Sequence, residues 1–333
     1  MSDGLLGRMF VSSPPKVALS ISGSVVSAVQ VRWKNGAPLL TGYGHSYLAE
    51  DTVAPMVSCG NVVDVRSLSD TIRRVVGRLS VKPTRIALVL PDIAAKVSLV
   101  RLTNVPSRET DLEELLRWKV GQSIPYPVAD AQIAYSRGTV GVDGTQEFVA
   151  SAVRRDVVEE YEGACIGAGL NPGYVDLTTF NLINTVMSAS RSGTDSVREI
   201  READWMLVNN ALDYVSVAIV RKGQLLFFRT VTSHSAATLP DVVHQACMYY
   251  NDRLAGDGLQ RAYLLNSTVK REGEEFIASN ELAGLESASV DVQLLAARLK
   301  SYFCGSMEVA TDLFEQLLAP LGVLIAVKHL THA

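Results

Sequence analysis

The sequence has few cysteines, and no two of them are close together. They are spread over 333 residues. Structural zinc sites and disulfide frameworks use cysteines at short, recurring spacings, so we expect neither here. Isolated cysteines of this kind are best explained as reduced thiols of a cytosolic protein. They are Cys59, Cys165, Cys247 and Cys304.

Concentrated charge and long hydrophobic runs are also missing. The formal net charge is -4 and no dense run of Lys and Arg occurs, so we expect no nucleic-acid-binding surface. The longest apolar stretch, Leu317–Val327, contains Pro320 and Gly322 and is too short to cross a bilayer. The N-terminal residues show neither an apolar signal core nor a membrane span, and Leu5–Phe10 is only a short apolar tag. We therefore expect a cytoplasmic protein.

No catalytic constellation is visible. The histidines are scattered, and no nucleophile motif accompanies them. Ser233 and Ser235 flank one histidine, an arrangement that we interpret as a loop. We predict no catalytic residue and no metal site among the histidines His45, His234, His244, His329 and His332.

The composition is that of an ordinary globular protein, with 47% hydrophobic and 20% charged residues, and the length allows two or more domains. The first half begins with Lys16–Trp33, which is expected to form two strands joined by a tight Gly-Ser turn, and a third strand at Leu39–Leu48 follows a turn at Lys34-Asn35-Gly36. An amphipathic helix follows, with an apolar stripe at 3.6-residue spacing. The stripe comprises Val65, Leu68, Ile72, Val75, Val76 and Leu79.

A buried strand follows at Arg85–Leu90. The sequence of strands and helices that opens the first half is then interrupted by an insertion that runs to about Val153. It then resumes with a helix at Asp156–Ala168 that ends at Gly169, a strand at Gly173–Leu177 and a crossover helix at Thr179–Ala189. Asp176, at the end of this strand, is expected to cap the following helix rather than to line a cleft.

The second half repeats the opening of the first. Three strands are expected, and a helix and a strand follow them, which indicates a duplicated two-domain fold with a cleft between the halves. These elements are Trp205–Asn210, Tyr214–Arg221, Gln224–Val231, Pro240–Leu254 and Arg261–Asn266. The chain is then expected to form a helix at Glu272–Leu282, a strand at Ala288–Val292 and an apolar helix at Phe314–Val327. The last helix is expected to be a buried closing helix, the alternative being a helix that lies on a membrane.

The least generic stretch is Thr110–Tyr135. Thr110 and Glu113 predict a capping box at the start of a helix, which should end at Gly121–Ser123 because prolines follow. A strand at Ala131–Ser136 and a partner at Glu147–Val153 are expected to form a hairpin across residues 142–144. The corner between helix and hairpin carries the rigid apolar side chains Trp118, Ile124, Pro125, Tyr126 and Val128.

This helix, proline corner and strand resemble the PilM family, the actin-like proteins of type IV pilus assembly, and the resemblance extends loosely over Lys16–Val327. It implies an α/β, actin-like (ribonuclease H-like) duplicated two-domain fold with an inserted small α+β subdomain. The first lobe would comprise residues 1–91 and 154–189, and the inserted subdomain residues 92–153. A linker at 190–203 would lead to the second lobe, 204–333.

In the family, the first hairpin of each lobe supplies a magnesium-side Asp, and glycine and serine amides hold the phosphates of a nucleotide. Ser20 stands at the Asp of the first hairpin, Ser22 at a Gly, Ser27 at a Lys and Gln30 at a Glu. Magnesium prefers carboxylates, and phosphoryl transfer needs the metal, so these changes argue against hydrolysis. Gly23 and Ser24 could still contact an anion.

The second hairpin and the adenosine loop have changed too. Asn209, Asn210 and Ala211 replace the Asp-Ile-Gly of the second hairpin, and Asp213 is displaced into the turn. The strand at Arg261–Asn266 runs into Ser267 and Thr268 without the glycine that lets adenosine approach the backbone. We therefore expect a degenerate ATPase fold without cofactor, in which Ser20, Ser22, Gly23, Ser24, Asn209 and Asn210 remain at the former nucleotide site.

The resemblance implies a cytoplasmic scaffold at the inner face of the cytoplasmic membrane, in a type IV pilus or related secretion platform. Its partners would be the cytoplasmic tail of a PilN-like, single-span membrane protein, other platform proteins and the motor ATPase. The residues proposed to bind the tail are Trp118, Ile124, Pro125 and Tyr126, the alternative being that they form the core of the inserted subdomain. Two alternatives are an active ATPase that binds ATP with magnesium through Gly23, Ser24 and Asn209, and a polymerising membrane-associated cytoskeletal protein.

Overall fold

The structure is a computed structural model that describes residues 14–34, 37–141, 143–191, 203–233, 235, 237–266, 291–305 and 307–330. The described residues contain two five-stranded sheets and one three-stranded sheet. The first sheet has the order β3-β2-β1-β4-β8, with bounds Val17–Ile21 for β1, Val25–Lys34 for β2, Ala37–Tyr47 for β3, Arg85–Leu90 for β4 and Asn171–Leu177 for β8. The second has the order β11-β10-β9-β12-β13, with bounds Asp204–Asn210 for β9, Tyr214–Arg221 for β10, Gln224–Thr232 for β11, Arg261–Asn266 for β12 and Asp291–Leu294 for β13.

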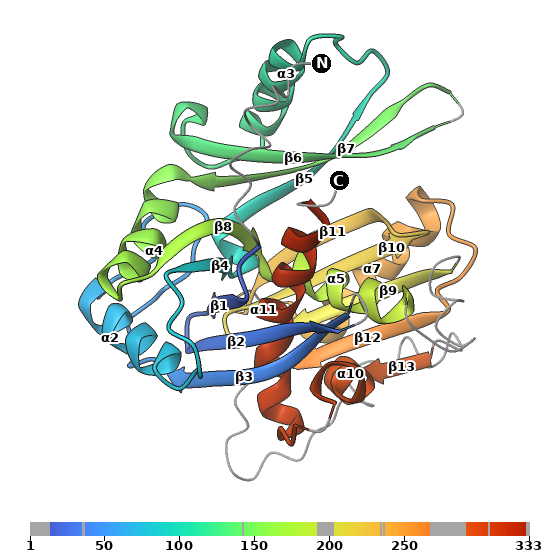
Figure 1. The fold of residues 1–333 in the computed structure, drawn as a ribbon. Helices are drawn as coiled ribbons and strands as arrows, with labels where there is room; N and C mark the ends of the chain where they lie inside the picture. Colours follow the sequence, from blue (N-terminus) through green and yellow to red (C-terminus); the bar gives the residue numbers. More distant parts are fainter. Residues whose placement is uncertain are drawn as a thin grey trace.

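The two large sheets have the same topology. In each, three antiparallel strands form consecutive hairpins, and two further strands lie parallel to the first. The predicted duplication is therefore confirmed. Figure 1 shows the two sheets on either side of a central helical layer.

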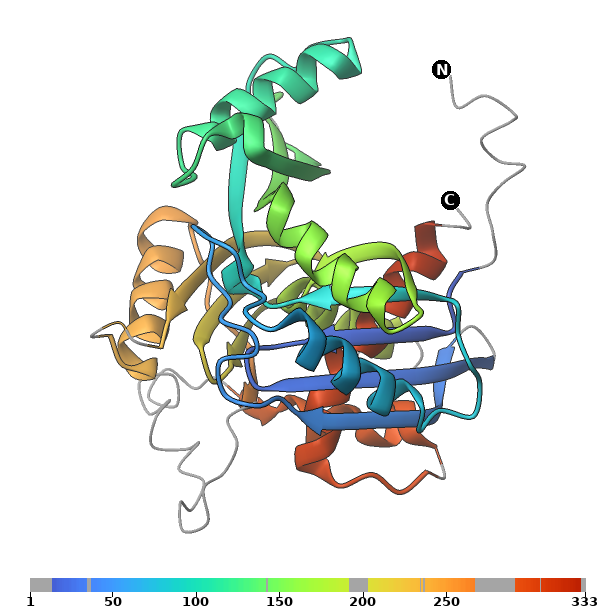
Figure 2. The ribbon, with the colours of Figure 1, turned by 90° about the vertical axis from the view of Figure 1, so that its left-hand side faces the viewer.

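The third sheet is part of an insertion between β4 and β8. Its order is β5-β7-β6, with bounds Ala95–Leu102 for β5, Ala131–Val140 for β6 and Gln146–Arg154 for β7. One α-helix, α3 (Glu109–Gly121), packs on it through Leu112, Leu116 and Val120, and this small core has Phe148 at its centre. The insertion projects from the two main sheets (Figure 2), and two short 3-10 helices belong to it, η1 (Asp92–Ala94) and η2 (Val128–Asp130).

The remaining helices cover the main sheets. Helices α2 (Val65–Val76) and α4 (Arg155–Gly167) pack on the outer face of the first sheet, and α7 (Leu239–Arg253) packs on the second. The layer between the sheets consists of α5 (Thr178–Arg191), α10 (Leu295–Cys304) and α11 (Thr311–Leu330).

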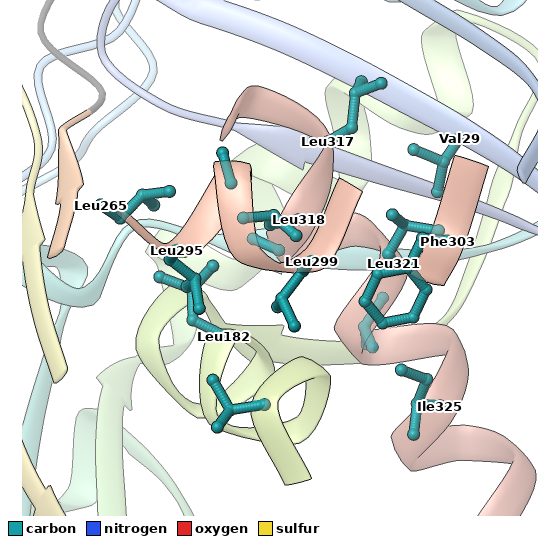
Figure 3. Packing of buried hydrophobic residues seen from close by; sticks show 14 of the residues in the cluster. Val29, Leu182, Leu265, Leu295, Leu299, Phe303, Leu317, Leu318, Leu321 and Ile325 are labelled. Atoms are coloured by element: carbon teal, nitrogen blue, oxygen red, sulfur yellow. The ribbon is translucent and has the colours of Figure 1, made fainter. Parts of the chain in front are cut away.

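Helix α11 joins the two halves through a shared hydrophobic core. Its leucines meet α5 and α10 between β2 and β12 (Figure 3). The predicted closing helix is thus confirmed, because Phe314, Leu317, Leu321 and Leu324 are buried. No described helix is long and apolar enough to span a bilayer.

At Gly322, α11 crosses α5 at very short range. A Cβ added there would overlap the backbone carbonyl oxygen of Asn181, so only glycine allows this crossing.

Several local predictions hold and others were wrong. Helix α3 ends at Gly121, and Gly169 follows α4 with a φ of +83°, as a helix-ending glycine should. The Thr110 capping box was wrong: α3 begins at Glu109, its N-cap is Arg108, two residues before Thr110, and the Thr110 hydroxyl donates to Asp111 Oδ1 instead. Val65 was also wrong as a core residue, because it lies exposed at the first turn of α2.

Helix α10 was not predicted from the sequence. The predicted strand Ala288–Val292 overlaps β13, which continues to Leu294, and residues 288–290 lie outside the described residues. The expected linker 190–203 overlaps the end of α5, and most of it lies outside the described residues. The predicted helix Glu272–Leu282, the apolar tag Leu5–Phe10 and His234 also lie outside them.

Candidate functional site

The two lobes meet where the first hairpin of one sheet faces the first hairpin of the other. Both turns are closed in the same way, by a backbone N–H that donates to the carbonyl three residues on: Ser22 to Val25 at 2.9 Å, and Ala211 to Tyr214 at 2.9 Å. The turns touch, since a Cβ added at Gly23 would overlap the carboxylate of Asp213.

Behind this contact lies a small polar cavity of about 40 Å³. Pockets that hold a drug-sized ligand or a cofactor measure roughly 300–1,000 Å³. The structure brings Ser20, Ser22, Ser24 and Asn209 together in the cavity wall, as the sequence predicted, but it does not place Asn210 there. The wall is completed by Val25, Ser27, Thr178, Ala211, Leu212, Asp213, Tyr214, Leu265, Glu315, Gln316 and Ala319.

Ser27 connects the first sheet to α11. Its hydroxyl donates to the carbonyl of Gln316 at 2.7 Å. In a regular helix this carbonyl would accept the N–H of residue 320, which here is a proline and has none. The internal Pro320 thus leaves a carbonyl for Ser27, and the buried site suits a short hydroxyl better than a lysine.

Asp92 lies at the junction of the insertion with both lobes, and its side chain is fully buried. It accepts hydrogen bonds from the backbone N–H of Thr179 at 2.9 Å, from the Thr179 hydroxyl and from Asn209 Nδ2 at 3.3 Å. Thr179 belongs to the first turn of α5, where a carboxylate is favoured by the helix dipole. Burial raises the pKa of Asp92, and the hydrogen bonds from Thr179, Ser216 and Asn209 oppose that rise.

The contact with Asp92 explains the asparagine at position 209. Asn209 is buried, and its amide group donates to the Asp92 carboxylate. An aspartate at 209 would place a second carboxylate against the first in a buried site, which is unfavourable. The residue that looks like a lost magnesium ligand is therefore a donor that links β9 to η1.

The expected helix cap at Asp176 was wrong in detail. Its Oδ1 accepts the N–H of Leu177 at 2.8 Å, one residue before α5, whereas the first-turn N–H of Thr179 goes to Asp92. Burial raises the pKa of Asp176 to about 6, and the nearby Asp92 adds to this rise.

The four residues proposed to bind a partner lie at the end of α3 and in the corner after it. Trp118 is 61% exposed, Pro125 is exposed, and Ile124 is half-buried against the small core of the third sheet. They are therefore not buried together as a core.

Tyr126 is held at the junction between the insertion and the first lobe. Its ring lies 5.9 Å from the Arg154 guanidinium, which donates to the carbonyl of Ser58 at 2.7 Å and pairs with Asp156. The Tyr126 hydroxyl is buried without a hydrogen-bond partner among the described residues, and burial raises its pKa to about 12. An unsatisfied buried hydroxyl is costly, so a ligand that supplies a partner would gain from it.

Comparison with known proteins identifies the family. The family model for the type IV pilus assembly protein PilM matches residues 18–244, more than half of the chain. The chain belongs to the PilM family. A search of curated proteins gave no match.

One of the solved structures that match this chain supports the fold, a PilM–PilN complex with a TM-score above 0.5. A PilM–PilN type IV pilus biogenesis complex matches at 15% identity with a TM-score of 0.73, covering 96% of this chain and 100% of that one. The cytoplasmic domain of EpsL, an inner membrane component of the type II secretion system of Vibrio cholerae, matches at 11% identity and a TM-score of 0.45, covering 84% and 96%. A Bacteroides thetaiotaomicron protein with an actin-like ATPase fold and unknown function matches at 12% identity and 0.45, covering 83% and 88%.

The chain thus has the α/β actin-like fold of a PilM protein, with two similar lobes and an inserted subdomain. Sequence reasoning missed Asp92, whose carboxylate accepts hydrogen bonds from Thr179 of α5 and Asn209 of β9. The only sequence signal was an acidic residue directly after a buried strand and Pro91.

Proposed function

We propose that this PilM-family chain is a cytoplasmic scaffold that holds the tail of a PilN-like membrane protein and does not hydrolyse ATP. It would work at the inner face of the cytoplasmic membrane, in a type IV pilus or related secretion platform. Contacts with other platform proteins and with the motor ATPase belong to the same proposal.

The observation that carries this proposal is the closed interlobe cleft. The two hairpin turns that would hold phosphates touch at Gly23 and Asp213, and the cavity behind them is about 40 Å³. Ser20 and Asn209 stand where magnesium-side carboxylates would be needed, and Asn209 already serves as a donor to Asp92. These contacts support a rigid two-lobed scaffold.

The partner side of the proposal is supported by family membership and by the corner after α3. The matched PilM–PilN complex contains PilN, so a PilN-like tail is the natural partner to test. Trp118 offers a large exposed apolar surface, and Tyr126 offers a buried hydroxyl that lacks a partner. Aromatic side chains of this kind commonly dominate the affinity of peptide interfaces.

The test measures binding of a PilN-like tail peptide to the purified chain by fluorescence anisotropy. Trp118→Ala should weaken binding by about tenfold or more, as expected for an interface aromatic. Tyr126→Phe removes only the hydroxyl and should weaken binding severalfold if the peptide donates to it or accepts from it. Tyr47→Ala, which removes another exposed aromatic ring, is the matched control and should leave the affinity unchanged.

Variants that remain folded and bind the peptide like the unmodified chain would remove Trp118 and Tyr126 from the partner site. Failure of every PilN-like tail to bind would remove the scaffold role itself.

A further inference from the structure

One edge of the first sheet is strongly basic, although the whole chain has a net charge of -4. We call it the basic edge. All its members are exposed, and they lie at the start of β1, at the end of β2, and at or just before the start of β4. They are Lys16, Arg32, Lys34, Lys82 and Arg85.

The pairing of β1 with β2 brings three of these residues together. The N–H of Val31 donates to the carbonyl of Lys16 at 3.0 Å, which places Lys16 beside the end of β2. Arg32 and Lys34 follow in the same strand, two residues apart, so their side chains lie on the same face of the sheet.

The two bases near the start of β4 lie at the same edge. β1 and β4 are parallel neighbours, and an extension of their register places Arg85 level with Lys16. The Ser80 hydroxyl donates to Gln30 Oε1 at 3.0 Å, which holds the segment before Lys82 against β2. The structure therefore collects on one edge bases that come from two distant parts of the sequence.

No acidic residue neutralises the basic edge in the sequence around it. Residues 14–34 and 71–91 contain no Asp or Glu. None of the five bases forms a salt bridge with a carboxylate among the residues that the structure describes. The Arg85 guanidinium instead lies against Gly173 of β8, where an added Cβ would overlap it. The five charges therefore add to a local positive potential.

The last turn of α11 packs against the same edge. Lys328 Nζ is 3.7 Å from the centre of the Trp33 ring, a cation–π contact at the end of β2. Figure 2 shows the start of β1 and the end of α11 on one side of the first sheet. Trp33 is thus half-buried beneath α11, although both of its neighbours in the chain are exposed bases.

The basic edge presents charge with little apolar surface. Among residues 14–34 and 78–85, Val81 is the one exposed hydrophobic side chain, and Trp33 is the one aromatic residue. Basic surfaces that insert into lipid carry apolar side chains beside their charges. Surfaces that bind single-stranded nucleic acid expose aromatic rings for the bases to stack on. The charge complementarity of this edge therefore fits best an acidic segment of a protein.

We propose that the basic edge binds a segment of a partner protein that is rich in Asp and Glu. Each of its two arginines can hold a carboxylate through two parallel N–H···O hydrogen bonds, and the lysines contribute further positive charge. Contacts of this kind speed association and weaken as the salt concentration rises.

This surface is separate from the proposed tail-binding corner. The basic edge lies at the amino ends of β1 and β4, whereas the insertion that carries Trp118 and Tyr126 follows the carboxyl end of β4. The proposal thus gives the chain a second partner surface and does not depend on the tail site.

The test measures binding of the purified full chain to a fluorescein-labelled peptide of alternating Asp and Glu, by fluorescence anisotropy at about 0.15 M salt. A peptide of the same length made of Asn and Gln is the neutral probe. Vesicles that contain phosphatidylglycerol and a single-stranded thymidine oligonucleotide are tested beside the two peptides.

Two variants that lose the same charge are compared. The edge variant combines Lys16→Gln, Arg32→Gln and Lys34→Gln, and Lys34→Gln with Lys82→Gln replaces it if it does not fold. The control variant neutralises exposed arginines elsewhere: Arg66→Gln, Arg155→Gln and Arg253→Gln.

We expect the unmodified chain to bind the acidic peptide at least about tenfold more tightly than the neutral one, and the edge variant to lose most of this difference. The control variant should bind the acidic peptide within about twofold of the unmodified chain, and salt at about 0.5 M should release the peptide. The affinity for the PilN-like tail peptide should not change in either variant.

Three results would overturn the proposal. They are no binding of the acidic peptide, equal losses in the edge and control variants, and tighter binding of the edge to the vesicles or the oligonucleotide than to the acidic peptide. The last result would assign the edge to a membrane or to a nucleic acid. Because the tail peptide is measured separately in the same variants, failure here is distinguishable from failure of the scaffold role.

Discussion

At the scale of single residues, two neutral side chains at positions that the PilM resemblance assigns to charged groups have contacts of their own. Ser27 donates to the carbonyl of Gln316 beside Pro320, and Asn209 donates to the buried Asp92. These two residues therefore have a structural role in this chain. The residues are held by interlobe hydrogen bonds, which a reversion to charge would break.

The buried carboxyl of Asp176 gives a pH prediction at this scale. Its pKa is raised to about 6 by burial, so between pH 4 and 6 the folded state keeps a proton that the unfolded state has released. The contribution of the protonated Asp176 carboxyl to the free energy of unfolding is fully present below pH 4 and is lost as pH rises through 6. Relative to Asp176→Asn, the unmodified chain should lose on the order of 2 kcal/mol of its free energy of unfolding between pH 4 and 7.

Denaturant unfolding of both proteins across this pH range measures the difference. Comparing the two proteins removes the opposite contribution of exposed carboxyls with lowered pKa, such as Asp156 and Asp241. A difference that stays constant with pH would show that Asp176 titrates normally.

At the scale of elements, α11 is the member that unites the fold. It belongs to the end of the sequence, yet it packs against α5 and the first sheet as well as α10. Proline and glycine are unusual inside a helix, and each allows a specific contact here. Pro320 has no N–H, so the carbonyl of Gln316 accepts the Ser27 hydroxyl instead, and Gly322 lets the backbone of α5 approach.

Two glycine substitutions in helices should have opposite effects on stability. Gly322→Ala forces a methyl group into the Asn181 carbonyl and should destabilise the chain by about 2 kcal/mol or more. Gly163→Ala in α4 meets open space and should stabilise it by roughly 0.5–1 kcal/mol, because alanine favours helices. Urea unfolding of both variants and of the unmodified chain measures the two changes in the free energy of unfolding. Equal changes in the two variants would contradict the close crossing of α5 and α11.

At the scale of the whole molecule, the two lobes are closed on each other. Their hairpin turns meet at Gly23 and Asp213, Asp92 ties α5 and β9 to the insertion, and α11 fills the layer between the sheets. A scaffold gains from such rigidity, because its partner surfaces keep a fixed relation to each other. The lobes of an ATPase of this architecture must instead admit a metal-bound nucleotide between them.

The closed cleft predicts that ATP with magnesium does not bind in the micromolar range. The cavity of about 40 Å³ is far smaller than the roughly 300–1,000 Å³ of a ligand pocket, and its wall holds Ser20 and Asn209 at the positions where the resemblance places magnesium-side carboxylates. Isothermal titration calorimetry and a phosphate-release assay should give no binding heat and no turnover. An actin-like ATPase titrated under the same conditions serves as the control, and micromolar binding with turnover by this chain would overturn the prediction.

The sequence alone determined most of the elements and their duplication, α10 being an exception, since periodicity, turn residues and prolines act over a few residues. It also led, through the PilM resemblance, to the prediction that both hairpins carry neutral residues where the family has acidic ones. It misplaced features that depend on small local differences, such as the cap of α3, where Thr110 and Glu113 matched a capping box but Arg108 precedes the helix.

Only the tertiary structure decided what the altered residues do. Ser27 and Gln316 are 289 residues apart, Asp92 and Asn209 are 117 apart, and Gly23 meets Asp213 across the two lobes. Such contacts follow from how two sheets pack around α5 and α11, and local sequence patterns carry no information about that packing.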